Sequence, residues 1–201
     1  MKIAIIGPGL MAIPPDGWGA VEILIWRYKC SLEKLGHEVV IYNTRDLAWV
    51  AEHINNNDYD FVHLQYDEYA GFFVQNLRKP FCCTTHFGYI LKEQNWHGYY
   101  PQIFHNTLHC PSILALSEGI QNKYLQHGYA GKIDYLRNGA EVTEFEFSEM
   151  GNGKAVVLGK IEPRKRQADI SNICSGKCEI DFVGPVVDDR FKENETCKHL
   201  G

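Results

Sequence analysis

Short apolar segments alternate with longer helix-like segments over the first 140 residues. The apolar segments cover residues 2–7, 38–42, 60–66, 80–85, 112–117 and 132–136. They are rich in β-branched and aromatic residues, and several are apolar almost throughout, which is typical of parallel strands buried on both faces. The alternation therefore predicts an α/β fold, a Rossmann-like parallel sheet with helices on both faces.

The segment between the first two predicted strands has a helical period. Its apolar residues recur at i, i+3, i+4, i+7, i+11 and i+14, as Val21, Leu24, Ile25, Tyr28, Leu32 and Leu35. Gly36 follows and ends the pattern. Further helices are predicted at 47–56, 67–78, 99–109 and 118–127, and Ser117 is placed to cap the last of them.

The pattern changes after residue 140. Residues 141–153 are acidic and then rich in Gly and Asn, which predicts a linker. Residues 154–201 contain a predicted strand at 155–159, a helix from about residue 163 and a strand at 179–183. One and a half βα units leave apolar faces without a covering layer, so 154–201 is expected to be the incomplete start of a second α/β domain without a core of its own.

Composition and charge narrow the function classes. The chain has 201 residues, of which 45% are hydrophobic and 22% charged, the balance of a globular protein. A formal net charge of −5 predicts no nucleic-acid partner. Seven scattered cysteines indicate reduced thiols and a cytoplasmic location. No apolar run approaches the roughly 20 residues of a membrane span, so no transmembrane segment is expected, and peripheral contact with a membrane stays open.

The first loop contains a nucleotide-binding motif in the wrong setting. Residues 7–12 match G-x-G-x-x-A, which holds a dinucleotide only where a helix begins within the motif. Pro14 and Pro15 would break such a helix, and the second strand ends at Asn43 without an acidic ribose ligand. We therefore expect no NAD site. The remaining loop leads through Gly17 and Gly19 to a helix start, whose backbone N–H groups favour an anion.

These residues resemble glycosyltransferase family 4 of the GT-B superfamily. That family has a proline-containing loop, an aromatic-Gly-Gly-x-Glu start of the first helix and a Gly-His-Glu-Val second strand. Here the corresponding residues are Pro14-Pro15, Trp18-Gly19-Ala20-Val21-Glu22 and Gly36-His37-Glu38-Val39. The match continues in order through 60–64, 79–86, 116–118, 137–139, 158–167 and 182–184.

The resemblance implies a fold, an activity and a separate role for each of the two parts of the chain. Residues 1–140 would be the acceptor-side domain, the amino-terminal half of a GT-B fold, and 154–201 the start of the nucleotide-sugar-binding domain. The implied activity is transfer of a sugar, of the hexosyl type, from a nucleotide-diphosphate-sugar to a saccharide or lipid-linked acceptor. It implies retention of the anomeric configuration and no cofactor or metal ion, because cationic side chains and helix dipoles stabilise the leaving diphosphate.

The resemblance also implies the site residues. Gly17 and Gly19 belong to the loop between acceptor and donor phosphate, and His86, the implied catalytic residue, faces the donor sugar. Lys160 and Lys165, together with Gly19, bind the donor diphosphate. Lys160 stands where the family has arginine. A single ammonium group therefore replaces a planar guanidinium, which can bind a phosphate through two N–H groups at once.

A further family element, the Glu-x7-Glu motif that holds the donor, is expected beyond Gly201. The chain alone is therefore expected to hold part of the site and to transfer no sugar. The alternative is a non-catalytic binding module, a truncated or split acceptor-side domain.

Overall fold

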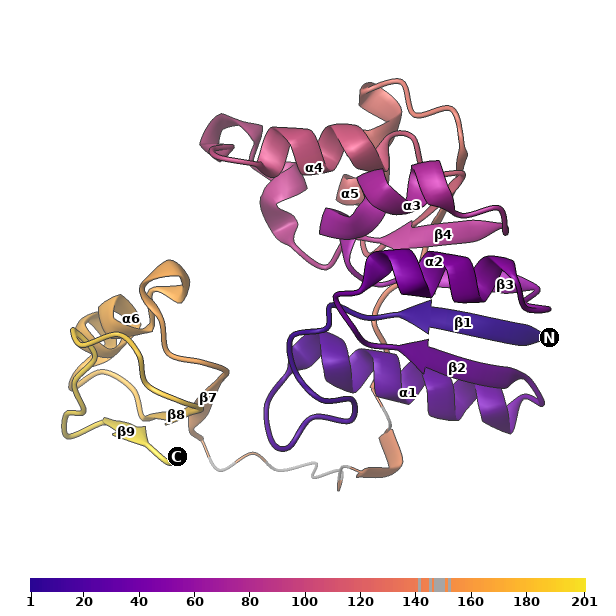
Figure 1. Ribbon diagram of the computed structural model, residues 1–201. Helices are drawn as coiled ribbons and strands as arrows, with labels where there is room; N and C mark the ends of the chain where they lie inside the picture. The colour runs from indigo at the N-terminus through magenta and orange to yellow at the C-terminus, as the bar shows by residue number, and fades with distance from the viewer. Residues whose placement is uncertain (141, 145, 147–150, 152) are drawn as a thin grey trace. The chain divides into compact units, whose positions relative to one another are not determined.

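The computed structural model describes residues 1–140, 142–144, 146, 151 and 153–201. The chain forms two compact units, Met1–Ala140 and Glu141–Gly201 (Figure 1). Of the predicted linker 141–153, positions 141, 145, 147–150 and 152 lie outside the described residues. Among the described residues, no helix is both long enough and apolar enough to cross a membrane.

The first unit is built on a six-stranded parallel sheet, which confirms the predicted fold class. Its strands are β1 (Lys2–Ile6), β2 (Glu38–Tyr42), β3 (Phe61–Leu64), β4 (Phe81–Thr84), β5 (Ser112–Ala115) and β6 (Lys132–Tyr135). Their order is β2-β1-β3-β4-β5-β6. The chain runs outward from β1 in both directions, so β1 and β3 flank the point where the strand order reverses. In open α/β sheets ligands bind at the carboxyl ends of strands at such a point.

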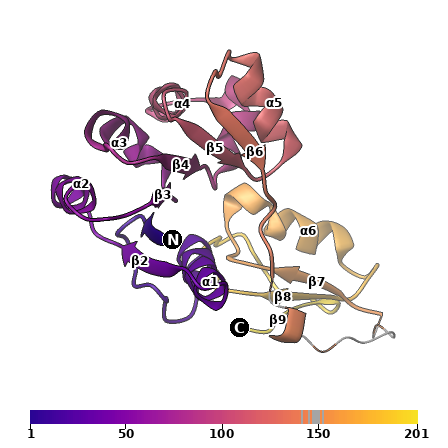
Figure 2. The ribbon, with the colours of Figure 1, turned by 90° about the vertical axis from the view of Figure 1, so that its right-hand side faces the viewer.

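Five α-helices cover the two faces of this sheet unequally. They are α1 (Ala20–Lys34), α2 (Leu47–Asn55), α3 (Ala70–Asn76), α4 (Tyr100–Thr107) and α5 (Glu118–Gln126). Alternate residues of a strand point to opposite faces. Ile3 and Ile5 of β1 accordingly pack with Ile25 of α1, whereas Ala4 and Ile6 belong to the cluster that includes α2 to α5. In Figure 2, α1 lies on one side of the six-stranded sheet, and α2 and α3 lie on the other.

The helix boundaries follow their predicted signals. Ser117 caps α5 by accepting a hydrogen bond from the Ile120 backbone N–H at 3.2 Å, as expected from its position. Gly36 follows α1 with φ of 84°, in the left-handed region that glycine adopts without strain. Leu35 lies beyond the last residue of α1 and is exposed rather than part of the buried helix face.

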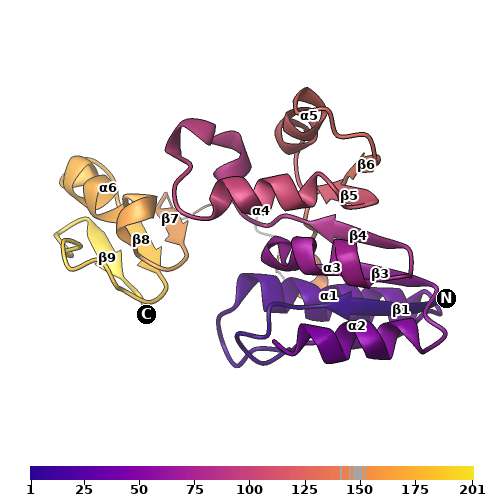
Figure 3. The same ribbon diagram turned by 45° about the horizontal axis from the view of Figure 1, so that its top comes forward.

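The described residues of the second unit form a three-stranded parallel sheet with one α-helix on one face (Figure 3). Its elements are β7 (Ala155–Leu158), α6 (Gln167–Cys174), β8 (Ile180–Val183) and β9 (Cys197–His199), in strand order β7-β8-β9. The prediction that this part has no core of its own is wrong. A buried cluster comprises Ile161, Ala168, Ile180, Phe182, Phe191 and Cys197.

The third strand explains this correction. Strand β9, which was not predicted, pairs with β8, and Phe191 belongs to the same buried cluster. The core is therefore built on three strands rather than two. The opposite face stays open, because Val156 and Leu158 of β7 are 64% and 80% exposed. The predicted helix from residue 163 is also corrected. Residues Pro163–Lys165 form a 3-10 turn, and α6 begins only after Arg166, whose φ of 60° interrupts the helix.

Candidate functional site

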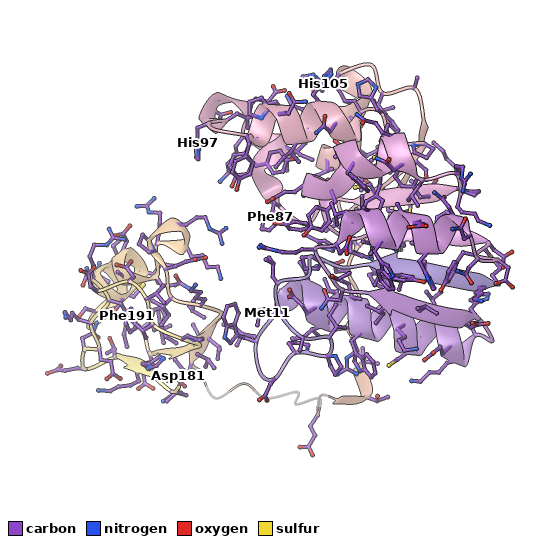
Figure 4. All side chains as sticks on the ribbon, viewed as in Figure 1. Met11, Phe87, His97, His105, Asp181 and Phe191 are labelled. Atoms are coloured by element: carbon purple, nitrogen blue, oxygen red, sulfur yellow. The ribbon has the colours of Figure 1, made fainter. Side chains whose placement is uncertain are left out.

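Three loops of the first unit meet at the carboxyl edge of its sheet. They follow β1, β3 and β4, three neighbouring parallel strands that end at the same edge. Figure 4 labels Met11 of the first loop and Phe87 of the third, and both lie at this edge. The predicted residues Gly17, Gly19 and His86 belong to these loops, so the fold brings them to one edge.

The loop after β1 is held in place by side chains of neighbouring elements. Asn43 accepts a hydrogen bond from the Gly9 backbone N–H at 2.8 Å and donates to the Met11 carbonyl at 2.7 Å. The Tyr69 hydroxyl donates to the Pro8 carbonyl at 2.7 Å. Asn43 therefore braces the loop at the position where a dinucleotide-binding fold has its ribose ligand. The helix begins at Ala20, not within the glycine motif, as predicted.

The two candidate glycines differ in their surroundings. Gly19 immediately precedes α1 with φ of 150°, and a Cβ built on it would lie 3.1 Å from both Glu22 Oε2 and Pro15 Cβ. Gly17 has φ of 90° and open space where a Cβ would stand. Among the described residues no side chain caps the start of α1. The first backbone N–H groups of this helix consequently remain suited to an anion.

His86 follows β4 and ends a buried chain of polar side chains. Its Nε2 lies 2.6 Å from Gln65 Oε1, and Gln65 Nε2 lies 3.1 Å from the ring nitrogens of His63. His63 Nε2 in turn lies 2.8 Å from Thr84 Oγ1. Burial lowers the pKa of His86 to about 4 and the pKa of His63 to about 3. Both imidazoles are therefore neutral near pH 7.

A second buried polar group lies beside this chain and was not predicted. Asp67, two residues beyond Gln65, is 2% exposed and accepts a hydrogen bond from the Tyr89 hydroxyl at 3.0 Å. Thr85 also hydrogen-bonds this carboxylate. Burial raises the pKa of Asp67 to about 6. The network ties the loop after β3 to the loop after β4, so it fixes the backbone on both sides of His86.

Acid should weaken the first unit through His63. The pKa of this side chain falls from 6.5 to about 3 on folding, so the unfolded chain takes up the proton first as pH drops. The contribution is complete above pH 6.5 and is lost as pH falls toward 3. At about pH 5.5 the loss should be about 1.4 kcal/mol of the free energy of unfolding. The change His63→Gln should abolish this part of the pH dependence.

The measurement is urea unfolding at neutral and mildly acid pH, followed by tryptophan fluorescence. All four tryptophans lie within residues 1–140, so the signal reports the first unit. His86 acts in the same direction as His63 and Asp67 in the opposite one, but both are present in wild type and variant and cancel in the comparison. An exposed histidine, changed as His109→Gln, should leave the pH dependence as it is. An unaltered profile in His63→Gln would contradict the assignment.

Lys160 and Lys165 belong to the turn after β7 in the second unit. Lys165 Nζ lies 3.2 Å from the position of a Cβ on Gly159, which places its ammonium close to the turn backbone. Its contact with Glu162 is long, at 3.7 Å, and Glu162 Oε1 also accepts from Arg164 at 2.6 Å. The two lysines therefore lie at a single turn, as their sequence positions predicted.

Backbone contacts shape this turn. Gln167 donates to the Lys160 carbonyl at 3.0 Å and accepts from the Glu162 backbone N–H at 3.1 Å. Gly184, at the end of β8, packs so closely that a Cβ on it would lie 2.7 Å from the Gly159 carbonyl carbon. The lysines are thus carried on a backbone whose course is fixed by Gln167 and by a glycine contact.

Candidate metal ligands do not gather at these sites. The triplet Asp58-Tyr59-Asp60 has the Asp-x-Asp spacing, but it precedes β3 at the amino edge of the sheet. There Asp58 pairs with Lys2 Nζ at 2.7 Å, and Asp60 accepts from the Lys2 backbone N–H at 2.7 Å. Within the described part of the chain, no three His, Cys, Asp or Glu side chains are grouped to hold a metal ion.

Comparison with solved structures identifies the fold as that of GT-B glycosyltransferases. The whole chain aligns with AviGT4, a glycosyltransferase of avilamycin A biosynthesis (TM-score 0.67, 13% identity, 63% of that protein). It also aligns with Anabaena HepE in complex with UDP-glucose (0.64, 15%, 69%). A third match is sucrose-phosphate synthase from Thermosynechococcus elongatus (0.71, 13%, 70%). The chain thus spans between 63% and 70% of these proteins, and at such identities the likeness concerns the fold.

The family follows from the sequence. The model of glycosyltransferase family 4 matches residues 35–144, more than half of the chain, so the protein belongs to that family. No curated protein matches the chain in a sequence search. The matched region includes His86 and both of its buried polar networks.

Proposed function

We propose that the chain is part of a glycosyltransferase that transfers a sugar from a nucleotide-diphosphate-sugar to a saccharide or lipid-linked acceptor. Transfer would be of the hexosyl type, with retention of configuration. Family membership supports the reaction class. The observation that carries the proposal is a neutral, half-buried imidazole, His86, held by hydrogen bonding at the ligand-binding edge of a parallel sheet.

The reaction makes two electrostatic demands, and named groups would meet each of them. A nucleotide diphosphate leaves with negative charge, which the ammonium groups of Lys160 and Lys165 and the amino end of α1 at Gly19 would stabilise. The sugar develops oxocarbenium character, and a neutral His86 would hydrogen-bond its hydroxyl groups without adding positive charge. Positive side chains and a helix dipole would do the work of a metal ion, and no cofactor is required.

The donor would be a nucleotide-sugar. HepE, one of the solved structures with this fold, was determined with UDP-glucose, with UDP and glucose, and with UDP. We further propose that the donor site is completed by Glu-x7-Glu residues that the family resemblance puts after Gly201. On that basis the 201-residue chain should bind nucleotide-sugars weakly and should transfer no sugar.

A direct assay tests this proposal. The purified chain is incubated with UDP-, GDP- and ADP-sugars, release of the nucleoside diphosphate is followed, and binding is measured by saturation-transfer NMR. We expect no turnover and a dissociation constant of about 1 mM or weaker, a binding free energy of about 4 kcal/mol at most. Rapid turnover would contradict the proposal that the site is partial. A complete lack of nucleotide binding, combined with binding of a saccharide, would favour the non-catalytic binding module.

A further inference from the structure

The four-residue chain Thr84–His63–Gln65–His86 crosses two neighbouring strands and emerges at the candidate site. His63 and Thr84 belong to β3 and β4, and Gln65 and His86 follow these strands directly. His63, Gln65 and Thr84 are buried, and only His86 is partly exposed. The contacts measure 2.8 Å, 3.1 Å and 2.6 Å along the chain. Each of these three hydrogen bonds needs one donor and one acceptor, so the role of one side chain determines the role of the next.

The primary amide of Gln65 sets that order. It has one acceptor, Oε1, and one donor group, Nε2, and the two face different histidines. Gln65 Nε2 must meet the unprotonated nitrogen of the neutral His63 ring. Gln65 Oε1 then accepts a hydrogen bond, so His86 must carry its proton on Nε2. Thr84, whose hydroxyl both donates and accepts, completes the far end of the chain.

We propose that Gln65 is a positioning residue that fixes His86 as the Nε2–H tautomer and turns its unprotonated Nδ1 toward the ligand. Among the described residues, nothing hydrogen-bonds Nδ1 of His86. This nitrogen then accepts a hydrogen bond from a hydroxyl group, which selects a neutral polyol such as a sugar and not an anionic phosphate. The inference rests on the proposed function, in which His86 faces the donor sugar.

The burial of the chain supports this assignment. The desolvation that lowers the pKa of His86 keeps the imidazole neutral, so one of its two nitrogens is always free to accept. His63 is neutral for the same reason, so it has one unprotonated nitrogen that accepts from Gln65 Nε2 in the observed orientation of the amide. A reversed amide would reverse the tautomer of His86. A measurement of the His86 tautomer therefore also reports the orientation of the Gln65 amide.

Long-range proton–nitrogen NMR spectra of the full chain, labelled with nitrogen-15 histidine, test the proposal. The His86 signals are assigned by their loss in His86→Ala. In the wild type at neutral pH, we expect the Nε2–H form of His86 to exceed the other tautomer by about tenfold or more, the bias of one buried hydrogen bond. The isosteric change Gln65→Met should reduce this ratio to a few-fold. Gln65→Glu should restore it, because a carboxylate accepts from Nε2–H in the same place.

The control is Gln102→Met, which removes an exposed glutamine on α4 and should leave the His86 spectrum unchanged. A wild-type His86 protonated on Nδ1, or a spectrum that Gln65→Met leaves unaltered, would overturn the proposal. The wild-type result alone is sufficient if Gln65→Met does not fold. The spectra need no ligand, so they test Gln65 independently of the proposed transferase activity. That activity is tested by His86→Ala in a transfer assay.

Discussion

Replacing His86 by alanine should lower sugar transfer by about 10²-fold or more, the effect of removing a preorganised hydrogen bond to the reacting sugar. The assay uses an active transferase that contains this chain. The imidazole is placed for this role, because its Nε2 hydrogen-bonds Gln65 Oε1, and within the described part of the chain its Nδ1 makes no hydrogen bond. The loss should fall on kcat, since the hydrogen bond strengthens as charge develops on the sugar.

The fold of the first unit should survive this change. His86 follows β4, is only partly buried and does not belong to the buried apolar cluster of the unit. His109→Ala is a matched control, because His109 is exposed and precedes β5 at the opposite edge of the sheet. It should transfer sugar at the wild-type rate. Wild-type turnover in His86→Ala would exclude a role in transfer, and loss of the unfolding transition would show that His86 is needed for folding instead.

Removing Lys165 should weaken UDP binding by about 10-fold to 10²-fold, which corresponds to the roughly 1.5–3 kcal/mol of a charge-assisted hydrogen bond. The ammonium group lies against the Gly159 turn, and its long contact with Glu162 leaves it able to bind a phosphate. Titration of Lys165→Ala with UDP and GDP in the same complete enzyme measures the loss. Lys160→Arg should bind the donor equally well or better, because it restores a bidentate fork.

Lys177→Ala is the matched control for this experiment. Lys177 is an exposed lysine of the same unit that follows the carboxyl end of α6. It carries the same charge away from the turn, so its removal should leave the UDP titration unchanged. Equal affinity of Lys165→Ala and wild type would remove Lys165 from the diphosphate site. Equal losses in both variants would show that only the net charge of the unit matters.

The apolar pattern predicted the first unit well because its central strands β1, β3 and β4 are buried on both faces. Each of the six observed strands lies inside a predicted apolar segment. Strand β9 lacks such a segment, since Cys197-Lys198-His199 is a strand only through its pairing with β8. Tertiary contact decided that element, and local sequence carries no comparable signal for it.

The sequence offered single candidate residues at the ends of strands but not the network that joins them. The end of a buried strand marked His86, whereas Gln65 and Thr84 become its direct and indirect partners through the pairing of β3 with β4. These partners are about 20 residues from one another in sequence, so no periodic pattern links them. In the sequence, Asn43 indicated only that the acidic ribose ligand of a dinucleotide site is missing. The structure shows that its side chain braces the loop after β1.

The contact between Gly184 and Gly159 makes the turn that carries Lys160 and Lys165 dependent on a distant position. A side chain on Gly184 would press on the Gly159 carbonyl group at 2.7 Å, and Gly184 already has φ of 130°. A side chain at residue 184 is therefore expected to disturb this turn, although the residue lies outside it. Directed evolution of donor preference should accordingly randomise Lys160 and leave residue 184 as glycine, because a side chain there would distort the turn that carries both lysines.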